Sequence, residues 1–243
     1  MKLPVVLLIL ILLLIFSDIL IKMIKEKKVT KTLKQRPISK EYRITSENEK
    51  NILIDVLDTD VKILEDKDID EIYIKMDYLY KEAYYKVFYD DFNIKILRDS
   101  IEDYKKVGHS GRILIKIPEK CSVSSLNLSL VNGDVEIYDS KIFNVKILSH
   151  TGSIKVETLK SNHISFEKYK GDIYLSNVDC ETLNMNIKEG NGDFGDVYGE
   201  SIHVKVLNGD FSFGNVSREE YEINDLKIDV QNGREILNVK SRR

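Results

Sequence analysis

The sequence contains no tryptophan, three prolines and only two cysteines among its 243 residues. The cysteines, Cys121 and Cys180, are too few and too far apart for a CxxC pair or a zinc site, and sequence alone leaves open whether they form a disulfide. HExxH, GxSxG, P-loop and GxGxxG motifs are also missing. The chain therefore offers no recognisable catalytic, cofactor-binding or metal-binding motif, and we expect no enzyme activity and no cofactor.

The charge is small overall but uneven along the chain. The net charge is −3, while one short segment contains seven bases: Lys22, Lys25, Lys27, Lys28, Lys31, Lys34 and Arg36. Without these seven and Lys2, 29 basic residues remain; without Asp18 and Glu26, 38 acidic residues remain, so residues 37–243 carry a charge of 29 − 38 = −9. An acidic body lacks the clustered basic face that phosphate contacts require, which argues against a nucleic-acid partner.

The N-terminus contains the one long apolar run. Residues 3–21 include only Ser17 and Asp18 as polar interruptions, and as a helix they would span about 28 Å, close to the thickness of a bilayer core. Because no small-x-small cleavage pattern follows, we predict a retained single-pass transmembrane helix in residues 1–24, with a cleaved signal peptide as the alternative.

The side of the membrane is ambiguous. The positive-inside rule places the basic flank, residues 22–36, in the cytoplasm, where it would contact anionic headgroups. A domain outside the cytoplasm normally shows the opposite bias.

Glycine turns recur through the second half of the chain. They align at Gly133, Gly152, Gly171, Gly192 and Gly209, with spacings of 19, 19, 21 and 17 residues. Seven and five residues before each glycine stand apolar side chains: Leu126 and Leu128, Val145 and Ile147, Ile164 and Phe166, Met185 and Ile187, and Ile202 and Val204. After each turn the second and fourth positions are also apolar, except at Asp196. Each unit is two half-buried strands joined by a corner, too small to bury its own face, so we predict an all-β solenoid with coils of roughly 20 residues.

The repeat is weaker at both ends. Thr59 and Asp60 fit the turn positions of a degenerate first coil, while near Gly233 the inward position holds Glu235 and Ile236 is displaced by one, as expected where the ladder stops. The predicted organisation is an anchor in 1–24, a basic and polar linker in 25–50, N-terminal coils or a separate cap in 51–124, regular repeats in 125–215 and a C-terminal cap in 216–243. The loop "RDSIEDYKKVGHSG" is expected to be exposed.

The stretch "RILIKIPEKCSVSSLNLSLVNGDVEI" and the recurrent GD(V/I)x(I/L) turns resemble the DUF4097 family of proposed adhesins over residues 50–235. The resemblance implies a β-solenoid, tethered to a bacterial membrane, usually outside the cytoplasm and sometimes associated with envelope stress responses. It brings no catalytic residues to this chain.

Two sets of polar residues suggest chemistry, but each has a simpler interpretation. Asp134, Asp172, Asp193 and Asp210 share one repeat position, as a calcium ladder would, yet Asn-Gly and Gly-Asp are ordinary turn dipeptides and the nine-residue calcium repeat is absent. His109, His150, His163 and His203 are scattered without a metal-binding pattern. We therefore assign no metal site.

Aromatic residues crowd one short segment. Eight of the 21 aromatics lie within twenty residues: Tyr73, Tyr78, Tyr80, Tyr84, Tyr85, Phe88, Tyr89 and Phe92. They either pack as a cap over the open end of the solenoid or stack on a sugar or a partner protein. The six tyrosines are the best candidates for a binding surface.

We expect a non-enzymatic, membrane-anchored solenoid that presents a binding surface for envelope adhesion or stress sensing, with an envelope protein or glycan as its partner. One alternative is a cytoplasm-facing scaffold that self-associates. The other is a polysaccharide-cleaving β-helix, which the outward column Asn127, Lys146, Ser165, Asn186 and His203 disfavours because it contains no pair of carboxylates.

Overall fold

The computed structural model describes residues 38–45, 47–78, 85–98, 111–215 and 223–237. The predicted membrane segment 3–21, the basic flank 22–36 and nearly all of the loop expected to be exposed lie outside these ranges. Within them, no helix has the length and apolar character needed to cross a bilayer. Residues 38–243 form one compact unit.

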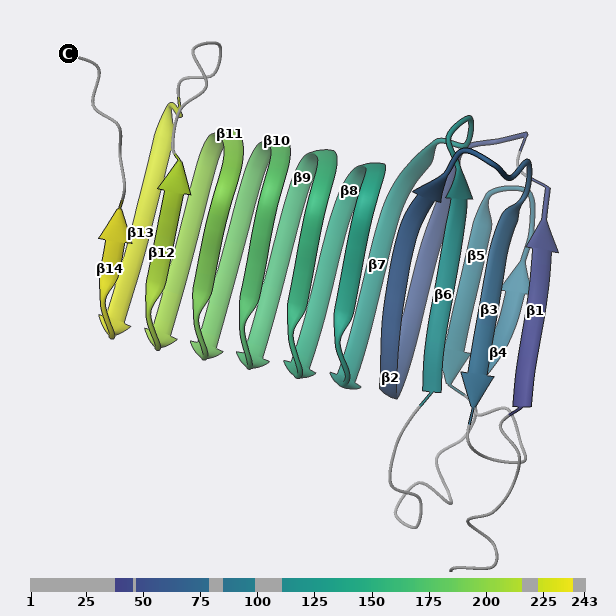
Figure 1. The fold of residues 1–243 in the computed structure, drawn as a ribbon, viewed down its shortest axis with the longest axis horizontal. Coiled ribbons are helices and arrows are strands. Elements are labelled where there is room, and N and C mark those ends of the chain that lie inside the picture. The colour runs from purple at the N-terminus through teal and green to yellow at the C-terminus, as the bar shows by residue number, and fades with distance from the viewer. Residues whose placement is uncertain (1–37, 46, 79–84, 99–110, 216–222, 238–243) are drawn as a thin grey trace, which may run out of the picture. The chain divides into compact units, whose positions relative to one another are not determined.

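The described part of this unit is all-β, as predicted. Its fourteen strands are β1 (Ile38–Ile44), β2 (Lys50–Asp66), β3 (Ile72–Tyr78), β4 (Tyr85–Tyr89), β5 (Asn93–Arg98), β6 (Gly111–Pro118), β7 (Val123–Asn132), β8 (Val135–Thr151), β9 (Ile154–Lys170), β10 (Ile173–Glu189), β11 (Gly192–Asn208), β12 (Phe211–Asn215), β13 (Asp225–Asn232) and β14 (Glu235–Leu237). They lie side by side, and from β7 onward they follow one another as successive coils (Figure 1). The long strands β8 to β11 pair in parallel with their neighbours, so the fold is the predicted β-solenoid.

The regular part has a constant offset of 19 residues from one coil to the next. In this register Ile154 lies beside Ile173, and Val145 lies beside Ile164. Inward side chains therefore stack on inward side chains of the next coil, and almost all of them are fully buried. Parallel in-register stacking lets each small unit bury its apolar face against its neighbours.

Glycine is required at one corner of every regular coil. Five glycines with positive φ, between 100° and 144°, occur at 19-residue intervals: Gly133, Gly152, Gly171, Gly190 and Gly209. A Cβ atom on Gly171 would lie 1.8 Å from the carbonyl oxygen of Gly152, and a Cβ on Gly190 would lie 2.1 Å from that of Gly171. Each corner thus occupies the space that a side chain would need in the next coil.

The prediction that Gly192 marks a turn is wrong. Gly190 has a φ of 140°, whereas Gly192 is a buried residue at the start of β11, paired with Ile173. A Cβ on Gly192 would come within 2.7 Å of the ring of Phe211, so this inward position is small because the neighbouring coil fills it. The error arose because "GNGD" offers two glycines, and only the first lies over Gly171.

The correct register also changes the partners of this coil. Leu183, and not Met185, lies beside Ile164. Phe194, and not Asp196, lies beside the inward residue Leu175, so the apparent exception in the apolar pattern disappears.

Aromatic packing fills the core beside Gly192. Phe194 is fully buried and packs edge to face against Phe211 and Phe213, with ring centroids 4.9 and 5.4 Å away. The missing side chain of Gly192 leaves room for the Phe211 ring.

A second corner of the coil has positive φ without glycine. Asp139, Thr158 and Asn177 have φ values of 43°, 58° and 53°, and Asn177 donates a hydrogen bond to Thr158, 19 residues earlier. Asp and Asn tolerate this left-handed region better than most residues, whereas a β-branched threonine is strained there. The sequence pattern contained no glycine to reveal this corner.

The aspartates at the glycine corner join consecutive coils. The Asp134 side chain accepts a hydrogen bond from the Ser153 amide (2.7 Å), and the Asp172 side chain accepts one from the Asn191 amide (2.6 Å). Asn191 and Asp210 continue the series to the amides of Asp210 and Arg234. Ser153 and Asn191 separate the carboxylates of Asp134, Asp172 and Asp210, whereas Asp60 lies directly beside Asp134 in the same column.

The predicted column of four aspartates therefore loses one member. Asp193 lies outside it, and its side chain accepts a hydrogen bond from the Ser212 hydroxyl. Its assignment to the column followed from the misplaced turn at Gly192.

The N-terminal region begins with one more coil. The first half of β2 pairs in parallel with β5 and the second half with β6, so β5 and β6 together take the place of the preceding coil. Antiparallel strands extend both sides: β3 and β1 beyond β6, and β4 beyond β5. The described residues of this region thus contain the coil β2, a coil position divided between β5 and β6, and an antiparallel extension.

The predicted linker 25–50 includes a strand of this extension. In β1, Ile44 is buried and Tyr42 packs against the core. The folded body therefore includes β1 from Ile38 on, thirteen residues before the predicted start of the N-terminal coils at residue 51.

A lysine is buried in the solenoid. Lys168 in β9 is 2% exposed and donates a hydrogen bond to Ser149 Oγ (2.6 Å) in the preceding coil. Burial lowers the pKa of Lys168 to about 8, and nearby Asp134 and Asp172 oppose this shift. The lowered pKa means that the ammonium form is an unfavourable charge in the core.

We expect Gly171→Ala to lower the free energy of unfolding by at least about 2 kcal/mol, because it adds left-handed strain and overlaps the Gly152 carbonyl. Gly195→Ala is the matched control, since its Cβ would meet nothing closer than 3.5 Å. Urea unfolding of the full chain measures both. Equal unfolding midpoints for the two variants would contradict the steric argument.

Lys168 should make stability depend on pH. An unfolded lysine has a pKa near 10.5, and the folded pKa is about 8, so between these values the unfolded state binds more protons and stability rises with pH. Below the folded pKa the penalty is fully present. We expect Lys168→Met to raise the free energy of unfolding at neutral pH by on the order of 2 kcal/mol.

Urea unfolding of Lys168→Met and wild type, repeated from about pH 7 to about pH 9.5, checks this prediction. The difference between the two proteins should shrink as pH rises. A constant difference would argue against the buried charge.

Candidate functional site

The structure separates the predicted tyrosine cluster into different roles. Tyr80 and Tyr84 lie outside the described residues, as does the side chain of Tyr78. Tyr73 lies on β3, where the Arg43 guanidinium sits 5.5 Å from its ring centre. Tyr85 is buried, whereas Tyr89 is 55% exposed. The described tyrosines of the set therefore do not form one surface.

Tyr85 is a structural residue. Its hydroxyl lies 2.7 Å from Thr59 Oγ1 and accepts a hydrogen bond from the Leu57 amide. Desolvation raises the pKa of Tyr85, so the phenol stays protonated. It links the β4–β5 hairpin to the corner of β2.

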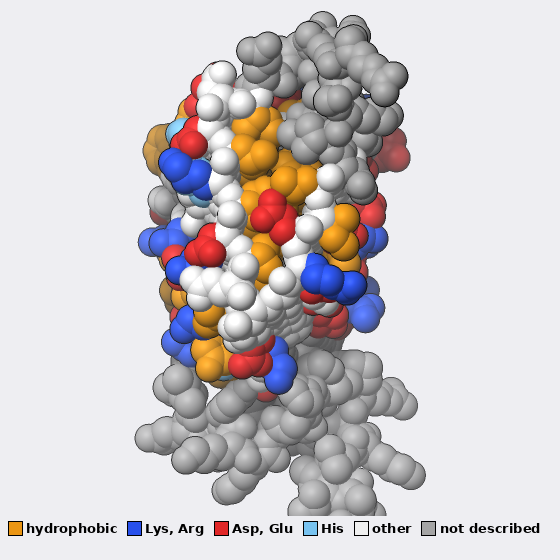
Figure 2. Space-filling view, turned by 90° about the vertical axis from the view of Figure 1, so that its left-hand side faces the viewer, with side chains coloured by type: hydrophobic (Ala, Val, Ile, Leu, Met, Phe, Trp, Pro, Cys, Tyr) orange, Lys and Arg blue, Asp and Glu red, His pale blue; other side chains and the backbone are white. Residues whose placement is uncertain are grey.

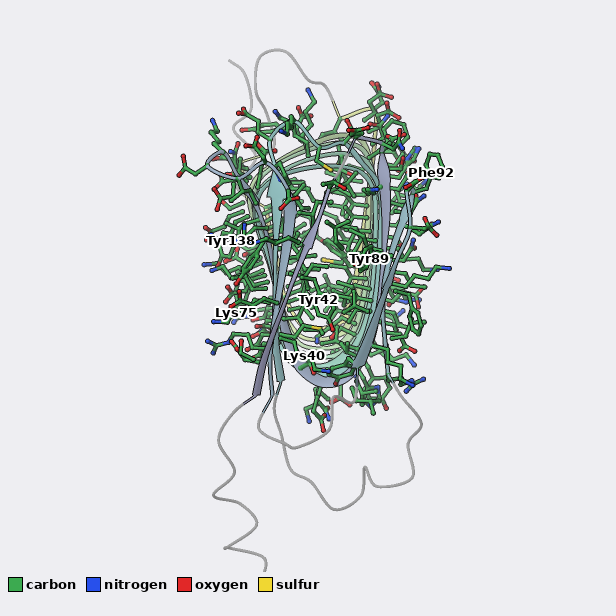
Figure 3. All side chains as sticks on the ribbon, turned by 90° about the vertical axis from the view of Figure 1, so that its right-hand side faces the viewer. Lys40, Tyr42, Lys75, Tyr89, Phe92 and Tyr138 are labelled. Carbon is green, nitrogen blue, oxygen red and sulfur yellow. The ribbon has the colours of Figure 1, made fainter. Side chains whose placement is uncertain are left out.

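Three aromatic side chains are exposed at the tip of this hairpin. Phe88, Tyr89 and Phe92 are 52%, 55% and 58% exposed and fall within five consecutive residues. Figure 3 shows Phe92 projecting away from the ribbon at the N-terminal end of the solenoid. Packing against the core would account for the many aromatic residues of this segment, but each of these three side chains is more than half exposed. We call Phe88, Tyr89 and Phe92 the aromatic tip.

The turn that carries the aromatic tip is held by several hydrogen bonds. Asp90 Oδ1 accepts from the amides of Phe92 (2.9 Å) and Asn93 (2.7 Å), and these bonds lower the pKa of Asp90. The buried Lys50 donates to the carbonyl oxygens of Asp90 (3.3 Å) and Asp91 (2.5 Å). A lysine 2% exposed thus ties the turn to β2, and the turn is ordered before any partner arrives.

The sequence did not reveal this support. Lys50 stands forty residues before the turn and belongs to no motif, so only the parallel pairing of β2 with β5 brings it there. The aspartate was a readable signal, because Asp at the first turn position commonly caps the following amides.

A second polar group lies on the side of the solenoid. His203 Nε2 is 2.7 Å from Asp225 Oδ2 and 3.4 Å from Lys227 Nζ. Hydrogen bonds from His203 and Lys227 lower the pKa of Asp225. Asp225 stands 22 residues after His203, so the 19-residue spacing of the repeat did not place it there.

The group does not have the geometry of a catalytic triad. Ser201 Oγ is 3.4 Å from His203 Nε2, the same ring nitrogen that Asp225 contacts. A triad needs the serine and the carboxylate on opposite nitrogens, so that the imidazole takes the serine proton while the carboxylate orients the ring. The arrangement orients a surface histidine and gives no route for nucleophile activation.

The outward column predicted around His203 changes by one member. Asn184, and not Asn186, lies beside Ser165 and His203, while Asn186 belongs to the neighbouring column with Glu167. Together with Lys205 and Lys227 these side chains line a shallow hollow on this face. Glu167 is the only carboxylate among the described residues that line it.

The remaining candidates for chemistry have structural roles or none. Cys121 and Cys180 are both buried and form no disulfide, and burial raises the pKa of Cys180 to about 12, which keeps it a protonated thiol. His150 stacks on Tyr169, with ring centroids 4.4 Å apart, and His109 lies outside the described residues. Among the residues that the structure describes, no three His, Cys, Asp or Glu side chains are grouped as metal ligands.

Solved structures resemble this fold at low identity. One is a proposed cell adhesion protein from Clostridium sporogenes, with 14% identity, a TM-score of 0.40 and coverage of 84% of this chain and 100% of that one. A proposed adhesin from Bacteroides fragilis has 12% identity, a TM-score of 0.47 and coverages of 84% and 98%. A proposed lipid-binding protein from Parabacteroides distasonis has 11% identity, a TM-score of 0.42 and coverages of 85% and 96%. None of the curated proteins compared with the chain matches it.

The family assignment rests on a sequence match that spans the whole described solenoid. The profile of the Toastrack DUF4097 family matches residues 39–237, from the first strand to the last. The resemblance seen in the glycine turns is therefore confirmed, and the chain belongs to the Toastrack DUF4097 family.

Proposed function

We propose that this protein is a membrane-anchored, non-enzymatic binding protein of the cell envelope, and that the aromatic tip contacts its partner. The observation that carries the proposal is the exposure of Phe88, Tyr89 and Phe92 on a turn that Lys50 and Asp90 hold in place. Family membership supports it, because the family resemblance brings a solenoid and no catalytic residues.

The aromatic tip has the properties of a binding surface. Exposed rings bury a large apolar area on contact, and aromatics are enriched among the residues that dominate binding energy. The fixed turn reduces the entropy lost when a partner binds. Asp90 and Asp91 place negative charge beside the rings, so we infer that the partner is an envelope protein with a basic or neutral surface.

The anchor and the side of the membrane belong to the same proposal. The apolar run 3–21 is long enough for a retained helix. Family resemblance supports a solenoid outside the cytoplasm. The second candidate, a cytoplasm-facing scaffold, is favoured by the basic flank 22–36 alone.

The absence of enzyme activity is also proposed. It is supported by the Ser201–His203–Asp225 contacts, which converge on one ring nitrogen. Carboxylates at the glycine corner bond to backbone amides of the next coil and are therefore occupied by the fold.

Reporter fusions test the side of the membrane. With alkaline phosphatase or a fluorescent protein fused after Arg243, we expect phosphatase activity in bacterial cells, because that enzyme folds only outside the cytoplasm. Fluorescence without phosphatase activity would instead support the cytoplasmic scaffold and remove the envelope role.

Photo-crosslinking tests the aromatic tip in the full chain. We expect p-benzoylphenylalanine at position 92 to give a specific crosslinked protein in intact cells. The same residue at position 174, which holds an exposed tyrosine in the regular coils, is the control and should give none. Identical capture from both positions, or none from position 92, would refute the tip as the contact surface.

A further inference from the structure

Among the described residues, the C-terminal end of the solenoid consists of strands with unpaired edges. Its last strands are β13 and β14, and β13 pairs with β11 while β14 pairs with β12. Within the described ranges, no strand pairs with the outer edges of either. A free strand edge presents backbone donors and acceptors to a second chain.

This end also exposes apolar side chains. Leu226, Ile228 and Val230 of β13 are only partly buried, although they lie beside Ile202, Val204 and Val206, which are almost fully buried in the preceding coil. In β14, Ile236 and Leu237 are 44% and 39% exposed. Figure 2 shows hydrophobic side chains down the middle of this end, with an acidic group among them.

The acidic residue at the inward position is Glu235. It pairs with Phe211, the inward residue of β12, in the column that earlier contains Val135, Ile154, Ile173 and Gly192. Every earlier member is apolar or glycine and is buried, whereas Glu235 is exposed. An inward-pointing charge on an edge strand blocks further stacking, since burying it without a partner is unfavourable.

Hydrogen bonds to the preceding coil hold the turn before β14. Arg234 donates two hydrogen bonds to Asp210 Oδ2, at 3.1 and 2.6 Å, and its amide bonds to Asp210 Oδ1. These contacts lower the pKa of Asp210. Because Arg234 is paired with the preceding coil, Glu235 follows a fixed turn.

The other end of the solenoid differs. β1 runs antiparallel to β3 and crosses part of the N-terminal opening, with Tyr42 over the core (Figure 3). A second copy would therefore find its matching open surface at the same C-terminal end. Such a contact is related by a twofold axis and closes as a dimer. It would also bring two Glu235 carboxylates into one apolar interface.

We infer that two copies of this chain can associate through their C-terminal ends, and that the charge of Glu235 opposes this association. This inference is independent of the aromatic tip, which lies at the opposite end. Because the contact joins two C-terminal ends, it stops at a dimer. Solenoids that form long polymers instead join different ends.

The test compares charge variants at this one position in the full-length chain, purified in mild detergent. Light scattering coupled to size-exclusion chromatography measures the protein mass, which is 28.1 kDa for one chain. We expect monomers for wild type and for Glu235→Lys, which keeps a charge there. Glu235→Val should form dimers, with self-association at least tenfold tighter than that of wild type.

Two further variants keep the result interpretable. Glu235→Gln removes the charge with little change in size, and it should also dimerise if Glu235→Val fails to fold. Glu189→Val replaces an exposed acid at the end of β10 and should stay monomeric. The inference is overturned if both neutral variants remain monomeric, if Glu189→Val dimerises equally, if wild type already dimerises through this end, or if the assemblies grow beyond dimers.

Discussion

The carbonyl oxygen at each glycine corner determines how this solenoid is built. It occupies the place of a Cβ atom in the next coil, so Gly152, Gly171 and Gly190 must follow one another at a constant interval. A coil of another length would place a side chain against a carbonyl or move the inward residues out of register. The uniform spacing and the stacked core both follow from this contact.

Polar side chains then reinforce the same register. The Asp134 and Asp172 carboxylates accept hydrogen bonds from amides of the following coil, and the neutral Ser153 lies between them. Lys168 is buried among the regular coils, where desolvation disfavours its charge. The regular coils thus use their corner groups to stabilise the stack, which occupies those groups within the fold.

Surfaces suited to binding occur where the repeat changes. At the N-terminal end, the antiparallel extension exposes Phe88, Tyr89 and Phe92 at a turn that hydrogen bonds hold in place. At the C-terminal end, Glu235 interrupts the column of inward apolar residues. We propose that the aromatic tip binds a partner and that Glu235 opposes stacking at the other end. Both features depend on ends, because side chains within the coils are constrained by neighbours on two sides.

The sequence by itself determined the solenoid, because alternating apolar residues between recurrent glycine turns can bury their faces only when successive units stack. It also identified Glu235 as the residue that interrupts the apolar pattern. It misplaced one turn at Gly192, since "GNGD" contains two glycines and only stacking over Gly171 selects Gly190. Tertiary structure alone divided the tyrosines into buried Tyr85 and exposed Tyr89. The reason is that Tyr85 lies against Leu57 and Thr59 of β2, which are distant in the sequence, whereas Tyr89 lies at the other end of β4 beside the exposed turn.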